Sequence, residues 1–345
     1  MRLLRLITFP FSIIYDFATT FRNKLYDLNI LESKEFKTPC IVVGNLSTGG
    51  TGKTPQIEYL IRLLQEKYKI AVLSRGYKRK TSGFLIANQK TTVEDIGDEP
   101  FQYFKKFSKI IVSVDSDRKR GISQLEELKN PPDVILLDDA FQHRKIKAGL
   151  AILLTSYNNL FCNDFLLPAG NLRESRKGAQ RAQIIIITKC PDDLNEENKT
   201  EIIEKLKPLK HQNVFFTRIG YDNDLKGSSS ENLNSFKGGE VVLVTGIANP
   251  KPMLNYLSKN EIVFHHFNFP DHYAFKNKDI DTIEKAFSEI QSNKKTVLTT
   301  EKDYVRIFAK FKNLHYLLIK TQFITDQLRF DNIIKNYVEQ SSRDR

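Results

Sequence analysis

The feature that most constrains the fold is an apolar run, CIVVGNL, that leads directly into the glycine-rich segment STGGTGKT at residues 47–54. The apolar run predicts a strand, and the residues after the glycines predict a helix. This order is typical of a nucleotide-binding site, because glycines let backbone amides approach phosphate oxygens and a helix begins with partial positive charge. The segment therefore predicts a phosphate-binding loop (P-loop).

The residues of this loop have expected roles. Lys53 is expected to reach the β- and γ-phosphates of ATP, and Thr54 is expected to hold Mg²⁺. The set expected around the nucleotide is Ser47, Thr48, Gly49, Gly50, Thr51, Gly52, Lys53 and Thr54. The strict motif G-x-x-x-x-G-K-[ST] has glycine where this chain has Ser47, which loosens the match. A chance GKT is the plain alternative, and the strand and helix on the correct sides argue against it.

A second apolar run, VILLDDAFQHR, places Asp138 and Asp139 directly after a predicted strand. A carboxylate in that position holds Mg²⁺ in P-loop proteins, directly or through water. An aspartate pair at the end of a strand also commonly caps the next helix. Beside the glycine-rich loop the metal interpretation is favoured, and it leaves open which aspartate is the ligand.

Apolar runs alternate with helical stretches along the chain. Strands are expected at residues 39–43, 70–74, 109–114, 134–137, 150–154 and 184–188, with helices between them, for example at 54–67 and 99–107. This alternation predicts an α/β fold, a mostly parallel sheet with helices on both faces. The polar stretch GYDNDLKGSSSENLNSFKGGE is expected to be a linker or surface loop, and more strands are expected after it at 241–245, 263–267, 296–299 and 316–319.

The first thirty residues carry an apolar stripe at three- and four-residue steps, which predicts an amphipathic helix. The stripe consists of Leu3, Ile7, Phe11, Ile14, Phe17, Phe21, Leu25 and Leu28. Its uncharged run, residues 6–15, is about half of the roughly 20 residues that span a bilayer, so the helix is expected to lie on a membrane. A helix packed on the protein's own core and a signal peptide are the alternatives. Pro10 is expected to kink the helix or to mark its start.

These patterns predict three parts: a membrane-associated helix at 1–30, a P-loop domain at 31–220, which the family resemblance given below implies to be a kinase domain, and a smaller α/β domain at 221–345. The net charge of +12 calls for an acidic partner. No nucleic-acid-binding signature accompanies the basic residues, so nucleic acid is not expected. The three cysteines are odd in number and far apart, which favours a reducing compartment.

Eight sequence blocks occur in the order typical of one family. They are VGNLSTGGTGKTP, LSRGY, GDEP, LDDAFQHR, LLPAGNLRE, TGIANP, FPDHY and TEKD, and the match around them extends from about residue 9 to residue 304. On these blocks the chain resembles the tetraacyldisaccharide 4′-kinases of lipid A biosynthesis. Ser47 also fits that family's pattern, whereas Asn171 stands where the family has proline.

The resemblance implies that ATP phosphorylates the 4′-hydroxyl of a tetraacyldisaccharide 1-phosphate, with lipid IVA as the product. It also implies Mg²⁺ as a cofactor and a place on the cytoplasmic face of the inner membrane, peripheral or monotopic. The expected partners are the glycolipid substrate and the membrane surface, and no stable protein partner is implied.

The resemblance also implies roles for single residues. Asp98 of GDEP would act as general base, supported by His272 of FPDHY; the plain alternative for Asp98 is a carboxylate that favours the start of a helix. Guanidinium groups match phosphate oxygens. The candidates for contact with the transferring phosphate or the substrate are Arg75, Arg118, Arg173 and Glu174.

Two other classes of protein remain as alternatives. The first is a P-loop GTPase or metallochaperone-like switch protein, because ITKCPDD follows a predicted strand where such proteins carry [NT]-K-x-D. Here Pro191 occupies the position of the aspartate that reads guanine. The second is a membrane-docked scaffold without catalysis.

Overall fold

The computed structural model describes residues 2–247, 249–271, 273–307 and 311–343. The chain forms two compact units: unit 1 consists of Met1–Arg218 and Thr321–Arg345, and unit 2 of Ile219–Lys320. The chain leaves unit 1 through strand β8 (Asn213–Tyr221) and returns through β15 (Ile319–Phe323).

Unit 1 is built from alternating strands and helices. In chain order they are α1 (Arg2–Asp27), β1 (Cys40–Asn45), α2 (Lys53–Leu64), β2 (Ile70–Ser74), β3 (Leu85–Ile86), α3 (Val93–Ile96), α4 (Asp98–Lys106), β4 (Ile111–Val114), α5 (Arg118–Glu126), β5 (Val134–Asp138), β6 (Leu150–Ser156), η1 (Phe161–Asn163), η2 (Arg176–Arg181), β7 (Ile184–Thr188), α6 (Glu196–Leu206), β8, β15 and α10 (Gln327–Arg343). The described strands form a nine-stranded sheet of order β15-β8-β7-β6-β1-β5-β2-β4-β3. Its pairs from β8 to β4 are parallel, and the short edge strand β3 is antiparallel to β4.

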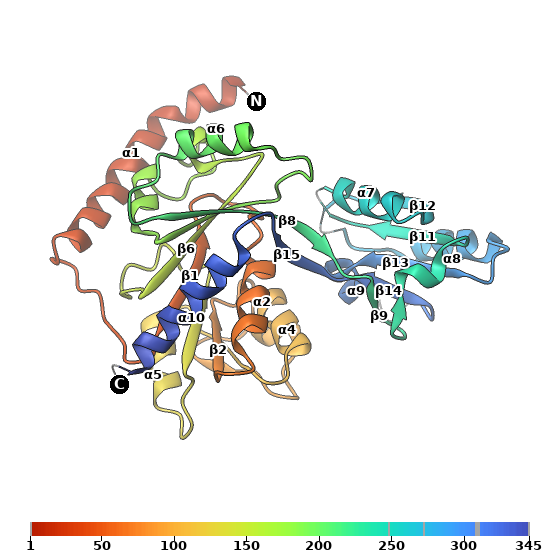
Figure 1. Cartoon of the computed structure of the whole chain (residues 1–345), viewed down its shortest axis with the longest axis horizontal. Helices are drawn as coiled ribbons and strands as arrows, with labels where there is room; N and C mark the ends of the chain where they lie inside the picture. The colour runs from red at the N-terminus through yellow and green to blue at the C-terminus, as the bar shows by residue number, and fades with distance from the viewer. Residues whose placement is uncertain (1, 248, 272, 308–310, 344–345) are drawn as a thin grey trace. The chain divides into compact units, whose positions relative to one another are not determined.

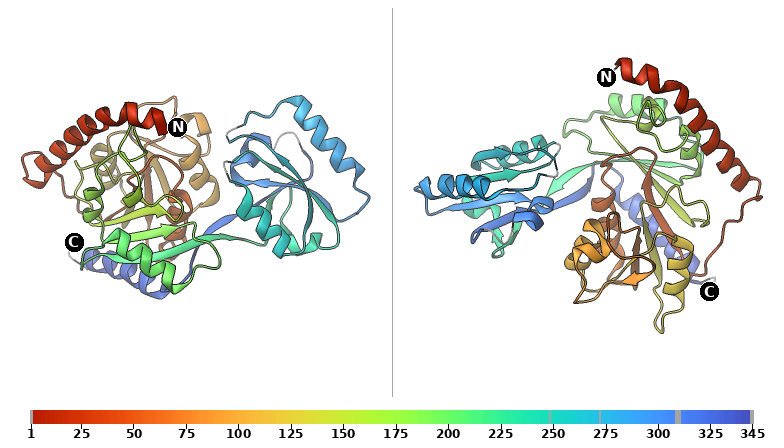
Figure 2. Two further views of the ribbon diagram at one scale, coloured as in Figure 1. Left: turned by 90° about the horizontal axis from the view of Figure 1, so that it is seen from above. Right: turned by 180° about the vertical axis from the view of Figure 1, so that it is seen from behind.

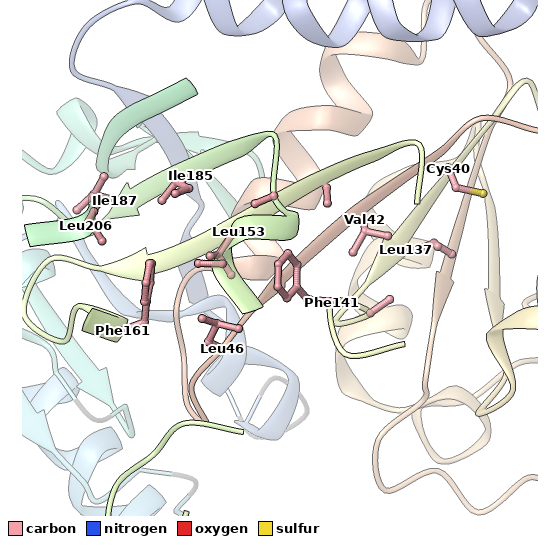
Figure 3. Packing of buried hydrophobic residues seen from close by; sticks show 14 of the residues in the cluster. Cys40, Val42, Leu46, Leu137, Phe141, Leu153, Phe161, Ile185, Ile187 and Leu206 are labelled. Atoms are coloured by element: carbon pink, nitrogen blue, oxygen red, sulfur yellow. The ribbon is translucent and has the colours of Figure 1, made fainter. Parts of the chain in front are cut away.

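The central strands of this sheet, β1, β2, β5, β6 and β7, are buried on both faces. In β1, Cys40 and Val42 enter one core while Ile41 and Val43 enter the other, because successive side chains point to opposite faces. The first core includes residues of α5 and α6, and Figure 3 shows it with strand side chains gathered around Phe141. The second core includes residues of α2, α4 and α10. The predicted α/β fold, with helices on both faces of a mostly parallel sheet, is confirmed.

Unit 2 has a smaller sheet of its own. Its elements are β9 (Asp224–Gly227), β10 (Glu231–Asn232), η3 (Leu233–Phe236), β11 (Glu240–Thr245), α7 (Lys251–Lys259), β12 (Val263–Asn268), α8 (Asn277–Glu289), β13 (Lys295–Thr300), α9 (Glu301–Ile307) and β14 (Leu314–Leu317). The described strands are ordered β10-β9-β14-β13-β11-β12, and β12, β11, β13 and β14 pair in parallel. The polar stretch expected to be a loop instead contains β9, β10 and η3. Its apolar residues Leu225, Leu233 and Phe236 account for this, since all three are buried in the core of unit 2.

The end of the chain differs from the expected boundary at 221–345. Residues from Thr321 onward belong with unit 1. The reason is that α10 buries Phe330, Ile334 and Val338, spaced four residues apart, in the second core of unit 1. Figure 1 shows α10 lying along the sheet, and Tyr59 of α2 donates a hydrogen bond of 2.7 Å to Asp331.

The amphipathic helix expected at 1–30 is α1, which lies along the outside of unit 1 in both views of Figure 2. It continues through Pro10, so this proline does not mark the start of the helix. Among the helices that the structure describes, none is both long and apolar enough to cross a membrane.

Candidate active site

The P-loop connects β1 to α2 at the carboxyl edge of the parallel strands, where ligands of open α/β sheets usually bind. Gly49 and Gly52 have φ angles of 111° and 86°, which side chains other than glycine rarely allow. Gly52 precedes α2, and no side chain caps the helix there. The first amides of α2 therefore stay open to an anion.

Lys53 lies between two oxygens at the end of the loop. Its Nζ is 3.5 Å from Oδ1 of Asn45 and 3.6 Å from Oδ1 of Asp139. Arg173 donates hydrogen bonds of 3.1 and 2.8 Å to the two carboxylate oxygens of Asp139. Burial of Asp139 works against its charge, but the hydrogen bonds from Arg173 and the charge of Lys53 outweigh burial and lower its pKa. Asp139 thus holds two cations beside the loop.

Asp138 has a different environment, although it is the next residue along the chain. It is 1% exposed, and its Oδ2 accepts hydrogen bonds of 3.4 Å from Ser74 and from Tyr103. Its Oδ1 is buried without a hydrogen-bond partner among the described residues. Burial, followed by the charges of Glu99 and Asp139, raises the pKa of Asp138 to about 7. A buried, unpartnered carboxylate oxygen is suited to a metal ion.

Glu99 was not expected as a site residue, yet it faces the P-loop. It is the second residue of α4, and Thr54 Oγ1 lies 3.5 Å from its Oε1. Mg²⁺ is usually bound by one or two carboxylates together with substrate phosphates. Asp138, Glu99 and Thr54 fit this requirement. Asp139 fits it less well, because Arg173 already occupies both of its carboxylate oxygens.

Asp98, the expected general base, begins α4 and is exposed. Gly97 before it has a φ of 88°, which brings the chain sharply into the helix. Because Asp98 is exposed, a substrate hydroxyl could reach its carboxylate from solvent. His272 lies outside the described residues.

The four residues expected to contact phosphate or substrate separate into two groups. Arg173 lies beside the P-loop, and Arg75 is exposed at the end of β2. Arg75 also lines an open cavity of ≈ 340 Å³ with Tyr77, Lys78 and Arg79. These two guanidinium groups remain near the surface on which a nucleotide or substrate would bind.

Arg118 and Glu174 lie in the interior instead. Arg118 is 1% exposed and donates hydrogen bonds to the backbone carbonyls of Asp115 and Asp138. Glu174 is fully buried, and each of its two carboxylate oxygens accepts a hydrogen bond of 2.8 Å from Arg181. Both are held by internal partners, and their contact with phosphate or substrate stays a prediction. Residue type alone did not distinguish such braces from ligands.

A basic group also surrounds His143 of the LDDAFQHR block, which the sequence did not single out. Burial, followed by the charges of Arg118 and Arg75, lowers the pKa of His143 to about 4. Arg22 of α1 contributes in the same direction. Positive side chains from three separate segments therefore act on His143, and the negative charge of Asp139 opposes them.

Two further residues, at the end of β7 and directly after it, contact the P-loop. Thr188 Oγ1 donates a hydrogen bond of 2.8 Å to the carbonyl of Thr51, and Lys189 Nζ donates one of 2.5 Å to the carbonyl of Gly50. Their position in ITKCPDD was the available signal. The threonine and lysine brace the loop here, while Pro191 leaves the guanine-reading position without a carboxylate.

Three of the matching blocks meet in unit 2. Asp303 of TEKD accepts hydrogen bonds of 2.8 Å from the amide of Gly246 in TGIANP and of 2.7 Å from the hydroxyl of Thr300. Residues of TGIANP and FPDHY line an open cavity of ≈ 350 Å³. The lining residues are Ile247, Pro250, Asn268, Phe269, Pro270 and Asp271.

The raised pKa of Asp138 predicts a pH-dependent stability. Between its ordinary pKa of about 4 and about 7, the folded state holds a proton that the unfolded chain has lost, so stability falls as pH rises through this window. Asp138→Asn should therefore raise Tm at pH 8 and change it little at pH 5, in thermal unfolding without nucleotide or Mg²⁺. The control Asp139→Asn should lower Tm at pH 8, because it leaves Lys53 and Arg173 without their carboxylate. An equal offset for Asp138→Asn at both pH values would contradict this account.

Comparison with known proteins agrees with this geometry. A family model described as Tetraacyldisaccharide-1-P 4'-kinase matches residues 4–339. A tetraacyldisaccharide 4'-kinase of Flavobacterium psychrophilum is 51% identical over 348 residues, covering 99% of each chain, and one of Flavobacterium johnsoniae is 50% identical over 344 residues, also covering 99% of each. The crystal structure of the "apo" form of LpxK from Aquifex aeolicus in complex with ATP has a TM-score of 0.76 and 32% identity, and the match covers 97% of this chain and 99% of that one. The chain belongs to the tetraacyldisaccharide-1-P 4'-kinase family.

Proposed function

We propose that this protein transfers the γ-phosphate of ATP to the 4′-hydroxyl of a tetraacyldisaccharide 1-phosphate, forming lipid IVA in lipid A biosynthesis. The observation that carries the proposal is a P-loop in which Lys53 lies beside the carboxylate of Asp139 and Thr54 beside that of Glu99. The chain that contains this loop belongs to this kinase family. The GTPase alternative has no matching base reader, because Pro191 stands in the aspartate position.

The donor side of the reaction depends on fixed positive charge. Lys53 and the amides at the start of α2 bind the β- and γ-phosphates, and Arg173 lies next to Lys53 on the same aspartate. Mg²⁺ held by Thr54, Asp138 and Glu99 would neutralise phosphate charge when bound. Asp139 orients Lys53 and Arg173 toward the loop. Positioning and charge stabilisation are the main contributions that a protein makes to phosphoryl transfer.

The acceptor side needs a group that takes the proton of the 4′-hydroxyl. Asp98 is an exposed carboxylate one residue before Glu99, so a base and a metal-facing acid follow one another at the start of α4. We assign the proton to Asp98, with His272 as its supporting group. The exposed guanidinium of Arg75 is the candidate for binding the anionic 1-phosphate.

The substrate's acyl chains require access to a membrane, and the outer face of α1 offers it. Four apolar side chains on this face are strongly exposed: Phe11 62%, Ile14 67%, Phe17 73% and Phe21 55%. Such a face stabilises a helix lying in the interface of a bilayer, and the net charge of +12 favours anionic headgroups. These features support our proposal that the protein acts on the cytoplasmic face of the inner membrane, as a peripheral or monotopic protein.

The main test is direct transfer of phosphate. Full-length protein with Mg²⁺, ATP labelled on its γ-phosphate and tetraacyldisaccharide 1-phosphate in detergent micelles should yield a lipid that carries the label. Lys53→Ala should nearly abolish transfer, because it removes the charge that bridges the β- and γ-phosphates. Absence of labelled lipid with the wild type, or equal transfer from GTP, would count against the proposal.

Asp98 and Glu99 form a matched pair for separating the base from the metal-facing acid. Asp98→Asn should lower kcat by about 10² to 10⁴ with little change in KM for ATP, because it acts on the chemical step. Glu99→Gln should instead raise the Mg²⁺ concentration needed for half-maximal rate. Steady-state kinetics over a range of Mg²⁺ measure both effects. A wild-type kcat for Asp98→Asn would return this residue to its alternative role at the start of a helix.

Membrane binding should depend on the outer face of α1. Replacing Phe11, Ile14 and Phe17 together by serine should lower partition onto anionic vesicles by more than about tenfold, since burying each such side chain contributes about 1.5–3 kcal/mol. Leu328→Ser is the control, because Leu328 is 78% exposed on α10. Vesicle flotation measures both. Unchanged flotation of the triple variant would exclude α1 as the anchor.

A further inference from the structure

The side of α1 that faces the protein is polar, unlike its outer face. Ser12 and Asn23 are 5% and 9% exposed. Ser12 Oγ donates a hydrogen bond of 3.0 Å to the carbonyl of Leu166 and accepts one of 3.0 Å from the amide of Ala169. Tyr15 donates its hydroxyl to the carbonyl of Arg173 at 2.9 Å. Spacings of three and eleven residues put these side chains on one stripe of the helix.

The polar side chains of this stripe all contact one stretch of chain, residues 166–174. The contact made by Asn23 is the one with a charged side chain. Asn23 Nδ2 donates a hydrogen bond of 3.0 Å to Oε2 of Glu174. This carboxylate is fully buried and also accepts from Gln142 at 3.0 Å and from Arg181. A buried carboxylate depends on every donor that it has, because an unmet lone pair in the interior is costly.

Residues 166–174 are also bonded to the P-loop itself. The amide of Thr48 donates 2.7 Å to the carbonyl of Asn171, and the amide of Arg173 donates 2.7 Å to the carbonyl of Leu46. Ser47 and Leu172 form an antiparallel bridge. Gln142, the partner of Glu174, donates a second bond of 2.8 Å to the carbonyl of Asn45.

Consecutive residues of this stretch therefore point in two directions. The guanidinium of Arg173 lies on Asp139 and Asn45 beside Lys53, while Glu174 lies under α1. A shift of Glu174 would move the backbone of Arg173, to which the loop is bonded. The helix is thus connected to the nucleotide site through one short peptide segment.

We propose that Tyr15 and Asn23 of α1 are positioning residues of the nucleotide site, acting through Arg173 and Glu174 on the P-loop. The helix then has two separable roles: its apolar face binds the membrane, and its polar face fixes the geometry of ATP binding. The inference deepens the proposed function, and it rests on ATP binding without requiring lipid phosphorylation.

The test measures the Kd for ATP of the full chain in detergent solution, without lipid substrate. Asn23→Ala should raise this Kd by about three- to tenfold, the effect expected for loss of one hydrogen bond to a charged group transmitted in part to the loop. Tyr15→Phe, which removes a single hydroxyl, should raise it less. Asn23→Gln, which keeps an amide donor, should recover part of the loss.

Thr20→Val is the matched control. Thr20 is exposed on the same helix and donates only within it, to Asp16 at 3.0 Å, so its removal should leave the Kd for ATP unchanged. Thermal unfolding identifies a variant that fails to fold, in which case Tyr15→Phe decides. An unchanged Kd in folded Asn23→Ala and Tyr15→Phe, or an equal rise in Thr20→Val, would overturn the inference. Failure of lipid phosphorylation with the Kd pattern intact would affect only the proposed function.

Discussion

The P-loop cannot hold its own shape, and the rest of the site depends on the groups that hold it. A glycine-rich loop outside regular secondary structure leaves its backbone donors and acceptors to be satisfied by other segments. Here β1 contributes Asn45, whose Nδ2 donates 2.7 Å to the carbonyl of Ser47. Thr188 and Lys189 bind the loop from β7, and residues 166–174 bind it in the manner of a short strand. With these carbonyls held from outside, the first amides of α2 remain open to a phosphate group.

The two neighbouring aspartates show how position in the fold separates identical chemistry. Asp138 ends β5 inside the protein, where burial raises its pKa to about 7 and one oxygen has no partner among the described residues. Asp139 has a φ of 48°, so the chain changes direction at this residue. Arg173 and Lys53 stabilise the carboxylate of Asp139 as an anion. On the proposed function Asp138 would gain a cation from bound Mg²⁺, whereas Asp139 already has Lys53 and Arg173 beside it. The left-handed backbone conformation of Asp139 gives the two carboxylates these different surroundings.

Much of the fold and the centre of the site could be predicted from the sequence, because they rest on local patterns. The predicted strands at 70–74 and 184–188 coincide with β2 and β7, since each is a short apolar run between turn residues. Burial of polar residues could not be predicted in the same way. Arg118 and Glu174 have the residue types of ligands, and only tertiary packing shows that internal partners hold them.

Contacts between segments far apart in the sequence could not be predicted either. The spacing of Phe330, Ile334 and Val338 predicts a buried face but does not say which sheet it covers. Glu99 likewise reads as an ordinary acid at the start of a helix until α4 is placed beside Thr54. Both cases need contacts between residues far apart in sequence.

The apolar stripe of the N-terminal helix α1 describes only one of its two faces. The apolar residues of α1 explain its outer face, yet they carry no information on what the opposite face does. That face is polar and hydrogen-bonded at Ser12, Tyr15 and Asn23. A helix that only anchored the protein would need no buried asparagine on a buried glutamate, because apolar contacts would attach it at lower desolvation cost. Directional hydrogen bonds fix orientation, and here they fix it relative to residues 166–174, which are hydrogen-bonded to the nucleotide loop. The hydrogen bonds therefore connect the helix that we propose to bind the membrane with the loop that we propose to bind the phosphoryl donor.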